Sequence, residues 1–155
     1  MIQTFLRTLW TPLKFYYQTK DIENGLCPGC ADHWPCNTAH LLYECTGLAS
    51  NVWNFIHSIL IDATGRTERL TKFQVLYLHR VQSLTEVTII VAGNRAIMRT
   101  ASKVAPPIHP KVAMACLKKE ILEVADTNMK ALREHTTWMK IARITKVKWQ
   151  EMVEN

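Results

Sequence analysis

A cluster of cysteines and histidines between residues 27 and 45, CPGCADHWPCNTAHLLYEC, constrains this chain more than any other feature. These positions hold four of the five cysteines and two of the six histidines. Five cysteines cannot all pair as disulfides. The first residues lack the apolar core and cleavage site of a signal peptide, so we expect an intracellular protein, cytoplasmic or nuclear. Thiols in such a reducing compartment bind metals more readily than they form disulfides, and the cluster therefore predicts a metal site.

Four residues of the cluster have the spacing of a metal-ligand set. Cys27, Cys30, His40 and Cys45 read C-x2-C-x9-H-x4-C. Zinc takes four tetrahedral sulfur or nitrogen ligands, and a Cys-x-x-Cys pair supplies two of them from one tight turn. The intervening Pro28 and Gly29 favour such a turn. Four protein ligands leave no position for water, so the pattern predicts one structural Zn²⁺ and no catalytic metal.

Other ligand sets remain open. His33 is close enough to Cys30 to compete, and Cys36 could replace His40 in an all-cysteine site. The alternative without metal is a set of buried free thiols or an adventitious disulfide. Cys116, which stands apart from the cluster, is expected to be a small core residue of a helix.

The spacing of the second ligand pair makes a geometric prediction. Five residues apart on a continuous α-helix, His40 and Cys45 would point about 140° away from each other. To share one ion, the helix that carries His40 must end or unwind just before Cys45, and Thr46-Gly47 provides a place for this.

Elsewhere, apolar residues recur at intervals of three and four, which predicts amphipathic helices. Thr11 and Pro12 form a helix start, and Gly65 forms a helix stop. The expected helices cover 47–65, 70–82, 86–104 and 114–132, and the apolar stripe of the second consists of Leu70, Phe73, Leu76, Tyr77 and Val81. Residues 87–91 could instead form a strand, and the tail over 138–152 fits either a strand or a helix. The predicted fold class is mainly α: a helical domain with a small CCHC zinc knuckle near the N-terminus.

The charge balance favours a polyanionic partner. Nineteen Lys and Arg against thirteen Asp and Glu give a formal charge of +6 and a pI near 9.2. Basic side chains gain free energy by releasing counterions from phosphates. Two helical segments concentrate them, and the predicted nucleic-acid contacts in these segments are Arg95, Arg99, Lys103, Lys140, Arg143, Lys146 and Lys148. The alternative is that these residues form an ordinary solvated face.

The tryptophans divide into stacking candidates and core residues. Trp34, inside the cluster, is the favoured residue for stacking on an unpaired base. Trp138 and Trp149 could stack as well, but their helical spacing favours the core. Trp10 and Trp53 are interpreted as core residues.

Several of these motifs occur together in a known family. The string TPLKFYY, CPGC, HLLYEC, VWNFI resembles the segment that follows the polymerase core in reverse transcriptases of LINE-type, non-LTR retrotransposons. The matching residues are Thr11 to Lys14, Cys27 with Cys30, His40 with Cys45, and Trp53. The match is specific over residues 8 to 60 and only architectural beyond them.

The resemblance implies a non-catalytic segment that helps hold element RNA or target DNA during target-primed reverse transcription. It divides the chain into residues 1–26, a helix and linker from the end of the polymerase; 27–65, the zinc knuckle and following helix; and 66–155, a basic helical region. Neither the paired aspartates of a polymerase nor the Pro-Asp motif of the associated nuclease occurs in the sequence. We therefore predict no enzymatic activity.

The predicted partners are RNA, DNA or both, together with the polymerase body of the same element. No membrane partner is predicted, because no stretch approaches the roughly 20 apolar residues that span a bilayer. The alternative function is a zinc-stabilised protein-interaction or scaffolding domain with no direct role in nucleic-acid binding.

Overall fold

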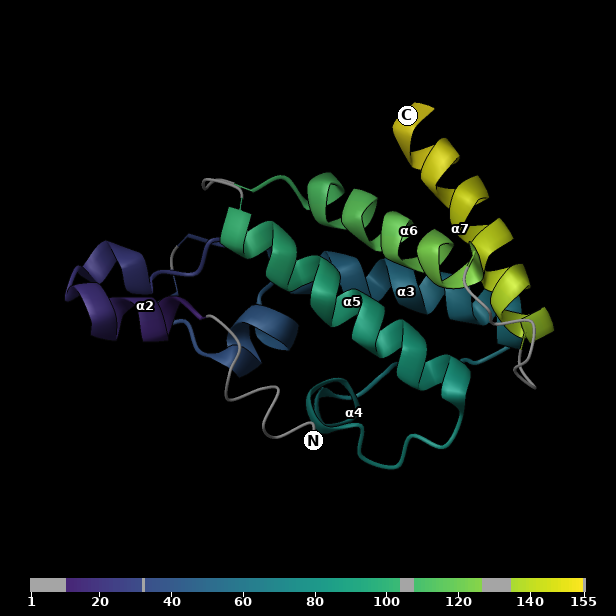
Figure 1. Cartoon of the computed structure of the whole chain (residues 1–155), viewed down its shortest axis with the longest axis horizontal. Coiled ribbons are helices and arrows are strands. Elements are labelled where there is room, and N and C mark those ends of the chain that lie inside the picture. Colours follow the sequence, from purple (N-terminus) through teal and green to yellow (C-terminus); the bar gives the residue numbers. More distant parts are fainter. Residues whose placement is uncertain (1–10, 32, 104–107, 127–134, 155) are drawn as a thin grey trace.

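A computed structural model describes residues 11–31, 33–103, 108–126 and 135–154. In these ranges the chain forms helices and no strand (Figure 1). In chain order the elements are α2 (Pro12–Thr19), the 3₁₀-helix η1 (Ile22–Gly25), the π-helix η2 (His40–Glu44), α3 (Ala49–Thr64), α4 (Lys72–Tyr77), α5 (Leu84–Lys103), α6 (Pro110–Asp126) and α7 (His135–Glu154). The prediction of a mainly helical fold is confirmed.

Helix α3 is the central element of the fold. It packs against α5, α6, α7 and η2, while α5 lies along α6 and α7 crosses one end of the group (Figure 1). Trp53 and Ile56 of α3 are buried, and a Cβ atom on Gly93 of α5 would lie 2.6 Å from the Trp53 ring. The absence of a side chain at Gly93 therefore lets α5 approach α3 closely.

One hydrophobic core runs from the cysteine cluster to the last helix. It includes Cys27, Leu41, Ile97, Leu117 and Trp138. This core crosses the predicted division between residues 65 and 66, because α3 packs on helices from both sides of it. The 27–65 segment and the C-terminal helices thus share one hydrophobic interior.

The predicted helix ends are confirmed. The Thr11 side chain accepts a hydrogen bond from the Lys14 N–H at 3.2 Å, with Pro12 in the first turn of α2. Gly65 ends α3 in the left-handed conformation, with φ of 73°. A residue without Cβ adopts this conformation at low cost, which explains why the helix stops there.

Two stretches with uncertain secondary structure are also settled. Residues 87–91 lie in α5 and the tail forms α7, so both are helical and not strands. The expected helix over 70–82 is shorter, because α4 ends at Tyr77 and Leu78 is left-handed. Phe73 and Tyr77, expected in its apolar stripe, are 61% and 50% exposed. The expected positions 127–132 of the fourth helix lie outside the described residues.

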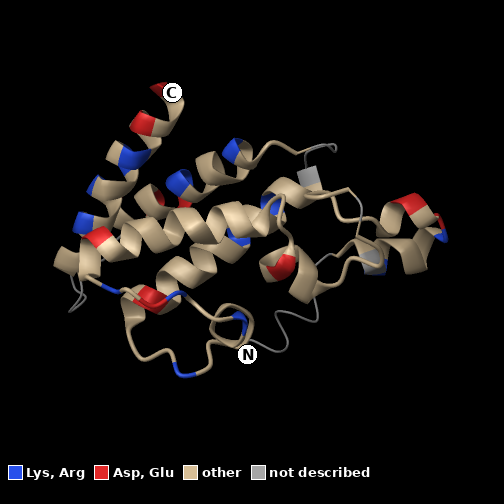
Figure 2. Ribbon diagram, turned by 180° about the vertical axis from the view of Figure 1, so that it is seen from behind, with Lys and Arg blue, Asp and Glu red and all other residues tan. Residues whose placement is uncertain are grey.

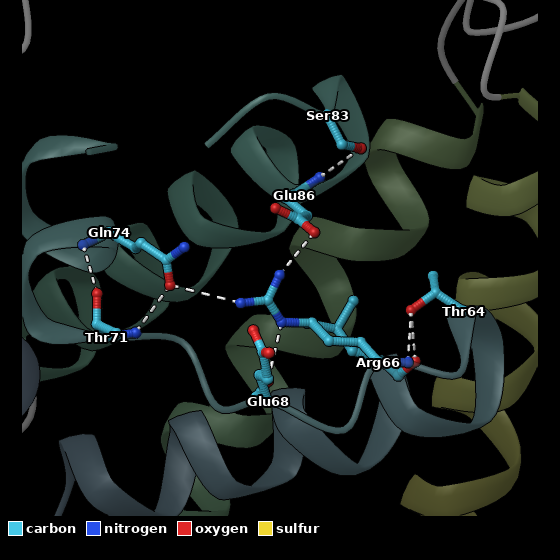
Figure 3. A network of polar contacts seen from close by, with 8 residues as sticks. Thr64, Arg66, Glu68, Thr71, Gln74, Ser83 and Glu86 are labelled. Carbon is cyan, nitrogen blue, oxygen red and sulfur yellow. Dashed lines mark hydrogen bonds and ion pairs between the residues drawn. The ribbon is translucent and has the colours of Figure 1, made fainter. Parts of the chain in front are cut away.

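A polar network joins the chain between α3 and α4 to the first turns of α4 and α5 (Figure 3). Arg66 donates through Nη1 to Glu86 Oε1 at 2.7 Å and through Nε to the Glu68 carbonyl at 2.9 Å. Its Nη2 lies 3.5 Å from Gln74 Oε1, which also accepts from the Thr71 N–H at 3.0 Å. Arg66 thus joins the α3–α4 connection to the first turns of α4 and α5.

Among the described helices, none combines the length and the apolar character needed to cross a membrane.

Candidate metal centre

The four predicted ligands meet at one point. The donor atoms of Cys27, Cys30, His40 and Cys45 all lie within 4.8 Å of one another. The Cys27 and Cys45 sulfurs are 3.5 Å apart, and Cys30 Sγ is 3.4 Å from His40 Nε2. Around a tetrahedral zinc, two sulfurs would be about 3.8 Å apart and a sulfur and a nitrogen about 3.6 Å apart. The cluster therefore has the size and donor set to hold one metal ion.

The polypeptide unwinds where the spacing of the second pair requires it. Residues His40–Glu44 form a π-helix, and the Cys45 N–H donates to the His40 carbonyl at 2.8 Å across five residues. This wider turn brings residues five apart onto the same side, which an α-helical turn would not. Cys45 itself is extended, with ψ of 118°. The prediction that the helix unwinds before Cys45 is confirmed.

Two glycines allow the turn that carries Cys27 and Cys30 to approach Cys45 and the residues that follow it. A Cβ atom on Gly29 would lie 2.8 Å from Cys45 Sγ and 2.6 Å from the Leu48 side chain. A Cβ on Gly47 would collide with the Gly29 carbonyl oxygen. Gly29 does not adopt a positive φ. It is therefore needed for the space it leaves, not for the turn conformation expected from the sequence.

The surroundings of the sulfurs favour the protonated thiols in the metal-free protein. A hydrogen bond with Cys36 and burial raise the pKa of Cys27 to about 12. Contact with Cys27 and burial raise the pKa of Cys45 as well. A metal ion must therefore displace protons from these thiols when it binds, as is usual for thiolate ligands.

The two alternative ligands lie beside the cluster and not in it. The His33 ring stacks on the His40 ring, with centroids 3.7 Å apart and planes 6° apart. Cys36 is fully buried against Cys27, and its N–H donates to the Gly25 carbonyl at 2.9 Å. His33 thus covers a ligand ring, and Cys36 anchors the loop that precedes η2. Cys116 is half-buried against the core, as expected for a structural residue.

The predicted basic face of α5 is paired with an acid. Arg95 Nε lies 3.7 Å from Glu120 Oε2, and Arg99 forms an ion pair with the other oxygen of the same carboxylate. Glu120 is only 5% exposed. The two arginines therefore neutralise a buried carboxylate on α6. Lys103 is the last residue of α5, and its side chain lies outside the described part of the structure.

The basic residues of α7 differ among themselves. Lys148 donates to Asp62 of α3 at 2.8 Å. Lys140, Arg143 and Lys146 are exposed and have no ion-pair partner among the described residues. In Figure 2 the basic residues of α7 are blue segments along the helix, and acidic residues, in red, lie at its C-terminal end.

The burial of each tryptophan decides whether it is a core residue or a candidate for stacking on a base. Trp138 is fully buried, with its N–H donated to the Ile121 carbonyl at 3.3 Å, so it is a core residue and not a stacking surface. Trp53 is core as well, and its N–H donates to the Leu42 carbonyl at 2.6 Å. Trp149 is half-buried beneath the Lys118 ammonium. Trp34 is 44% exposed, and its ring lies nearly perpendicular to the Tyr16 ring, with centroids 5.5 Å apart. Trp10 lies outside the described residues.

Sequence reasoning missed the acids that pair with the predicted basic residues. Glu120 follows directly after the acid-free segment 95–119. It occupies the same helical face as Ala113 and Leu117, two buried residues of α6. The sequence offered one signal of this pairing: Glu120 stands where the apolar periodicity predicts a buried residue. A buried carboxylate requires a cationic partner. Asp62 offered no comparable signal.

Comparison with protein-family models, curated proteins and solved structures finds no match to this chain.

Proposed function

We propose that the chain is a zinc-dependent nucleic-acid-binding segment without catalytic activity, of the kind found after the polymerase core of LINE-type reverse transcriptases. The ion in the Cys27, Cys30, His40, Cys45 cluster is one structural Zn²⁺. Three thiolates and one imidazole suit zinc, and a fourth protein ligand leaves no position for a reacting water. Zinc then holds the turn of Cys27 and Cys30 against η2 and the start of α3.

The observation that carries the nucleic-acid assignment is the unpaired basic face of α7. Lys140, Arg143 and Lys146 are spaced by three residues, so they fall within an arc of about 120° around the helix. All three are exposed, and none of them has an acidic partner in the described part of the chain. Cations that no protein carboxylate neutralises are the ones available to phosphates.

The other residues predicted to contact nucleic acid are not all assigned to binding in this proposal. Arg95, Arg99 and Lys148 are engaged in ion pairs, so they contribute mainly to the fold. Trp34 remains the aromatic candidate for stacking on an unpaired base, because much of its ring is accessible. RNA and DNA are both candidates for the strand, since a phosphate-tracking face does not distinguish them.

Salt-dependent binding tests the proposal. Fluorescence anisotropy with labelled single-stranded and duplex oligonucleotides, over a range of salt concentrations, measures the slope of log K against log[salt]. We expect a steep negative slope for the native protein, reduced by about 0.7 to 0.9 for each phosphate contact that is lost. The variant Lys140→Ala/Arg143→Ala should bind more weakly and with a shallower slope.

A matched variant controls for net charge. Arg80 and Lys119 are also exposed and without ion pairs among the described residues, but they lie outside α7. Arg80→Ala/Lys119→Ala removes the same charge and should retain most of the affinity. Equal losses in the two variants would mean that binding is a general charge effect, and absence of salt-dependent binding in the native protein would reject the proposal.

One observation favours the second function, a protein-interaction or scaffolding domain. Phe73 and Tyr77 of α4 stack at 6.4 Å between ring centroids and are largely exposed. An exposed aromatic pair is a common anchor in protein interfaces. This function predicts weak, salt-insensitive nucleic-acid binding and self-association or partner binding that Phe73→Ser/Tyr77→Ser abolishes, as measured by analytical ultracentrifugation.

A further inference from the structure

Beside the metal centre lies a pocket to which the proposed function assigns no role. It has a volume of about 400 Å³ and is bounded by the end of η2, one face of α3 and the chain just before α4. Ser50, Trp53, Asn54 and His57 of α3 line it at intervals of three and four residues. A pocket of this volume is within the range that binds small molecules.

The pocket is arranged for an anion. Arg69 Nη1 donates to Asn54 Oδ1 at 2.5 Å, which orients the guanidinium. Arg69 has no ion-pair partner among the described residues, so its remaining N–H groups are available. The acid in the lining, Glu44, is already paired with Lys72 at 2.9 Å. The local balance is thus positive, and a planar guanidinium suits a phosphate in particular.

Other polar groups in the lining also lack partners. The hydroxyls of Thr46 and Ser50 form no hydrogen bond within the described residues. His57 Nδ1 is buried and has no hydrogen-bond partner there either. Buried polar atoms are nearly always satisfied, by the protein, by water or by a ligand. This argument applies to His57 Nδ1, while the hydroxyls of exposed Thr46 and half-buried Ser50 are accessible to a polar ligand that enters beside Arg69.

The remaining wall is apolar, which distinguishes the pocket from a site for bare phosphate. Tyr43, Trp53 and Leu70 line it, and the Tyr43 hydroxyl is occupied by the Leu70 carbonyl at 3.1 Å. A ligand that carries both a phosphate and a flat apolar group would satisfy the two parts. A nucleotide has this composition, whereas the bases of a duplex are stacked and paired and cannot enter.

We propose that this pocket binds one unpaired nucleotide of a single-stranded nucleic acid, with its phosphate at Arg69 and its base or ribose against the apolar wall. The inference rests on the proposed function, because it assigns the bound strand to a defined site. Tyr43, Glu44 and Thr46 belong to the segment between and just after the ligands His40 and Cys45. The metal centre therefore holds one wall of the pocket in place.

Titration of the isotope-labelled full chain with a nucleoside 5′-monophosphate, followed by NMR, tests the site directly. We expect saturable shifts in the signals of Asn54, His57 and Arg69. The same titration with inorganic phosphate and with the unphosphorylated nucleoside should give weaker shifts. Shifts located on α7 and not in the pocket would overturn the proposal. Phosphate that binds as well as the nucleotide would also overturn it, because the apolar wall would then have no role.

A pair of arginine variants links the pocket to the strand. Arg69→Ala should weaken binding of a single-stranded oligonucleotide about tenfold or more, the loss expected when a charge-assisted contact is removed. It should leave binding of a blunt duplex unchanged. Arg80→Ala, an exposed arginine outside the pocket, should change neither. Circular dichroism and metal content verify that each variant is folded.

The outcomes separate this inference from the proposed function. Salt-dependent oligonucleotide binding that Arg69→Ala leaves intact would overturn the pocket assignment and preserve the function. A free mononucleotide that binds as tightly as the oligonucleotide would overturn the assignment to a strand. Absence of oligonucleotide binding to the native chain would reject the proposed function, and mononucleotide shifts in the pocket would then identify a site for free nucleotides instead.

Discussion

The imidazole of His33 lies flat against the imidazole of His40, 3.7 Å between centroids and 6° from parallel. His40 is almost fully buried, and its Nε2 lies in the candidate metal cluster, 3.4 Å from Cys30 Sγ, whereas His33 is exposed and contributes no donor atom to the cluster. The Cys27 N–H donates to the His33 carbonyl at 3.0 Å, which ties the backbone of the stacking residue to a ligand. His33 therefore restricts the orientation of the ligand ring from outside the cluster.

Replacing His33 should weaken metal binding without removing it. We expect His33→Ala to lower the affinity by about tenfold, the lower end for residues that orient a ligand. His33→Phe, which keeps a flat ring over His40, should retain most of the affinity. Competition with a chromophoric chelator measures both. If His33→Ala abolishes the metal stoichiometry, His33 is itself a ligand and the four-residue set is wrong.

Substitution of a ligand cysteine should remove the metal, whereas substitution of Cys36 should not. Metal content measured by mass spectrometry should be one zinc per chain in the native protein, and it should be lost in Cys27→Ser and in Cys45→Ser. Cys36→Ser is the matched control, because Cys36 is equally buried but lies outside the donor set. We expect it to retain the metal with some loss of stability.

Chelation provides the complementary measurement. Removing the metal should lower the thermal midpoint and the helical signal of the native protein, because metal-binding energy contributes to folding in such centres. A native protein without metal that is nevertheless fully folded would reject the structural zinc.

A side chain at Gly47 is predicted to destabilise the protein for a steric reason. A methyl group there would meet the Gly29 carbonyl and lie 3.2 Å from the Cys30 Cα, and backbone cannot move aside as a side chain can. We expect Gly47→Ala to cost about 1 to 3 kcal/mol of unfolding free energy, as overpacking does. Gly65→Ala is the control: nothing lies within 4 Å of an added Cβ, and the cost is only that of the positive φ. Denaturant titration compares them, and a smaller loss for Gly47→Ala than for Gly65→Ala would contradict the prediction.

The Arg66 network should contribute more to stability than the ion pair between Lys72 and Glu44. The Arg66 and Glu86 side chains are only 17% and 25% exposed, whereas those of Lys72 and Glu44 are 41% and 44% exposed. Arg66→Leu removes the donor to Glu86 Oε1 and to the Glu68 carbonyl, whereas Gln74 Oε1 keeps its bond from the Thr71 N–H, so we expect a loss of about 1 to 3 kcal/mol. Lys72→Ala should cost about 0 to 1 kcal/mol, as surface pairs do. Thermal or denaturant unfolding measures the difference, and equal losses would show that burial does not distinguish the two pairs.

Much of the metal cluster and of the helical fold could be predicted from the sequence because both depend on local spacing. The pair Cys27 and Cys30 lies in one turn, and the five-residue interval from His40 to Cys45 already required the helix to unwind. The cap at Thr11 and the stop at Gly65 are likewise determined by their immediate neighbours. The prediction over 70–82 was wrong at Phe73 and Tyr77 because the same periodicity describes a long helix and a short one with an exposed face.

Taken by itself, the sequence determined the excess of positive charge and favoured the mainly helical class and the set Cys27, Cys30, His40 and Cys45, whereas only the tertiary structure left His33 and Cys36 outside that set. The tertiary structure alone decided which charges are available, since the partners of Arg95, Arg99 and Lys148 come from other helices. It also brought Arg69 beside Asn54 and into one pocket with Tyr43 and Glu44 of η2. Local spacing fixes contacts within a turn, whereas contacts between helices depend on how their apolar faces pack in the common core.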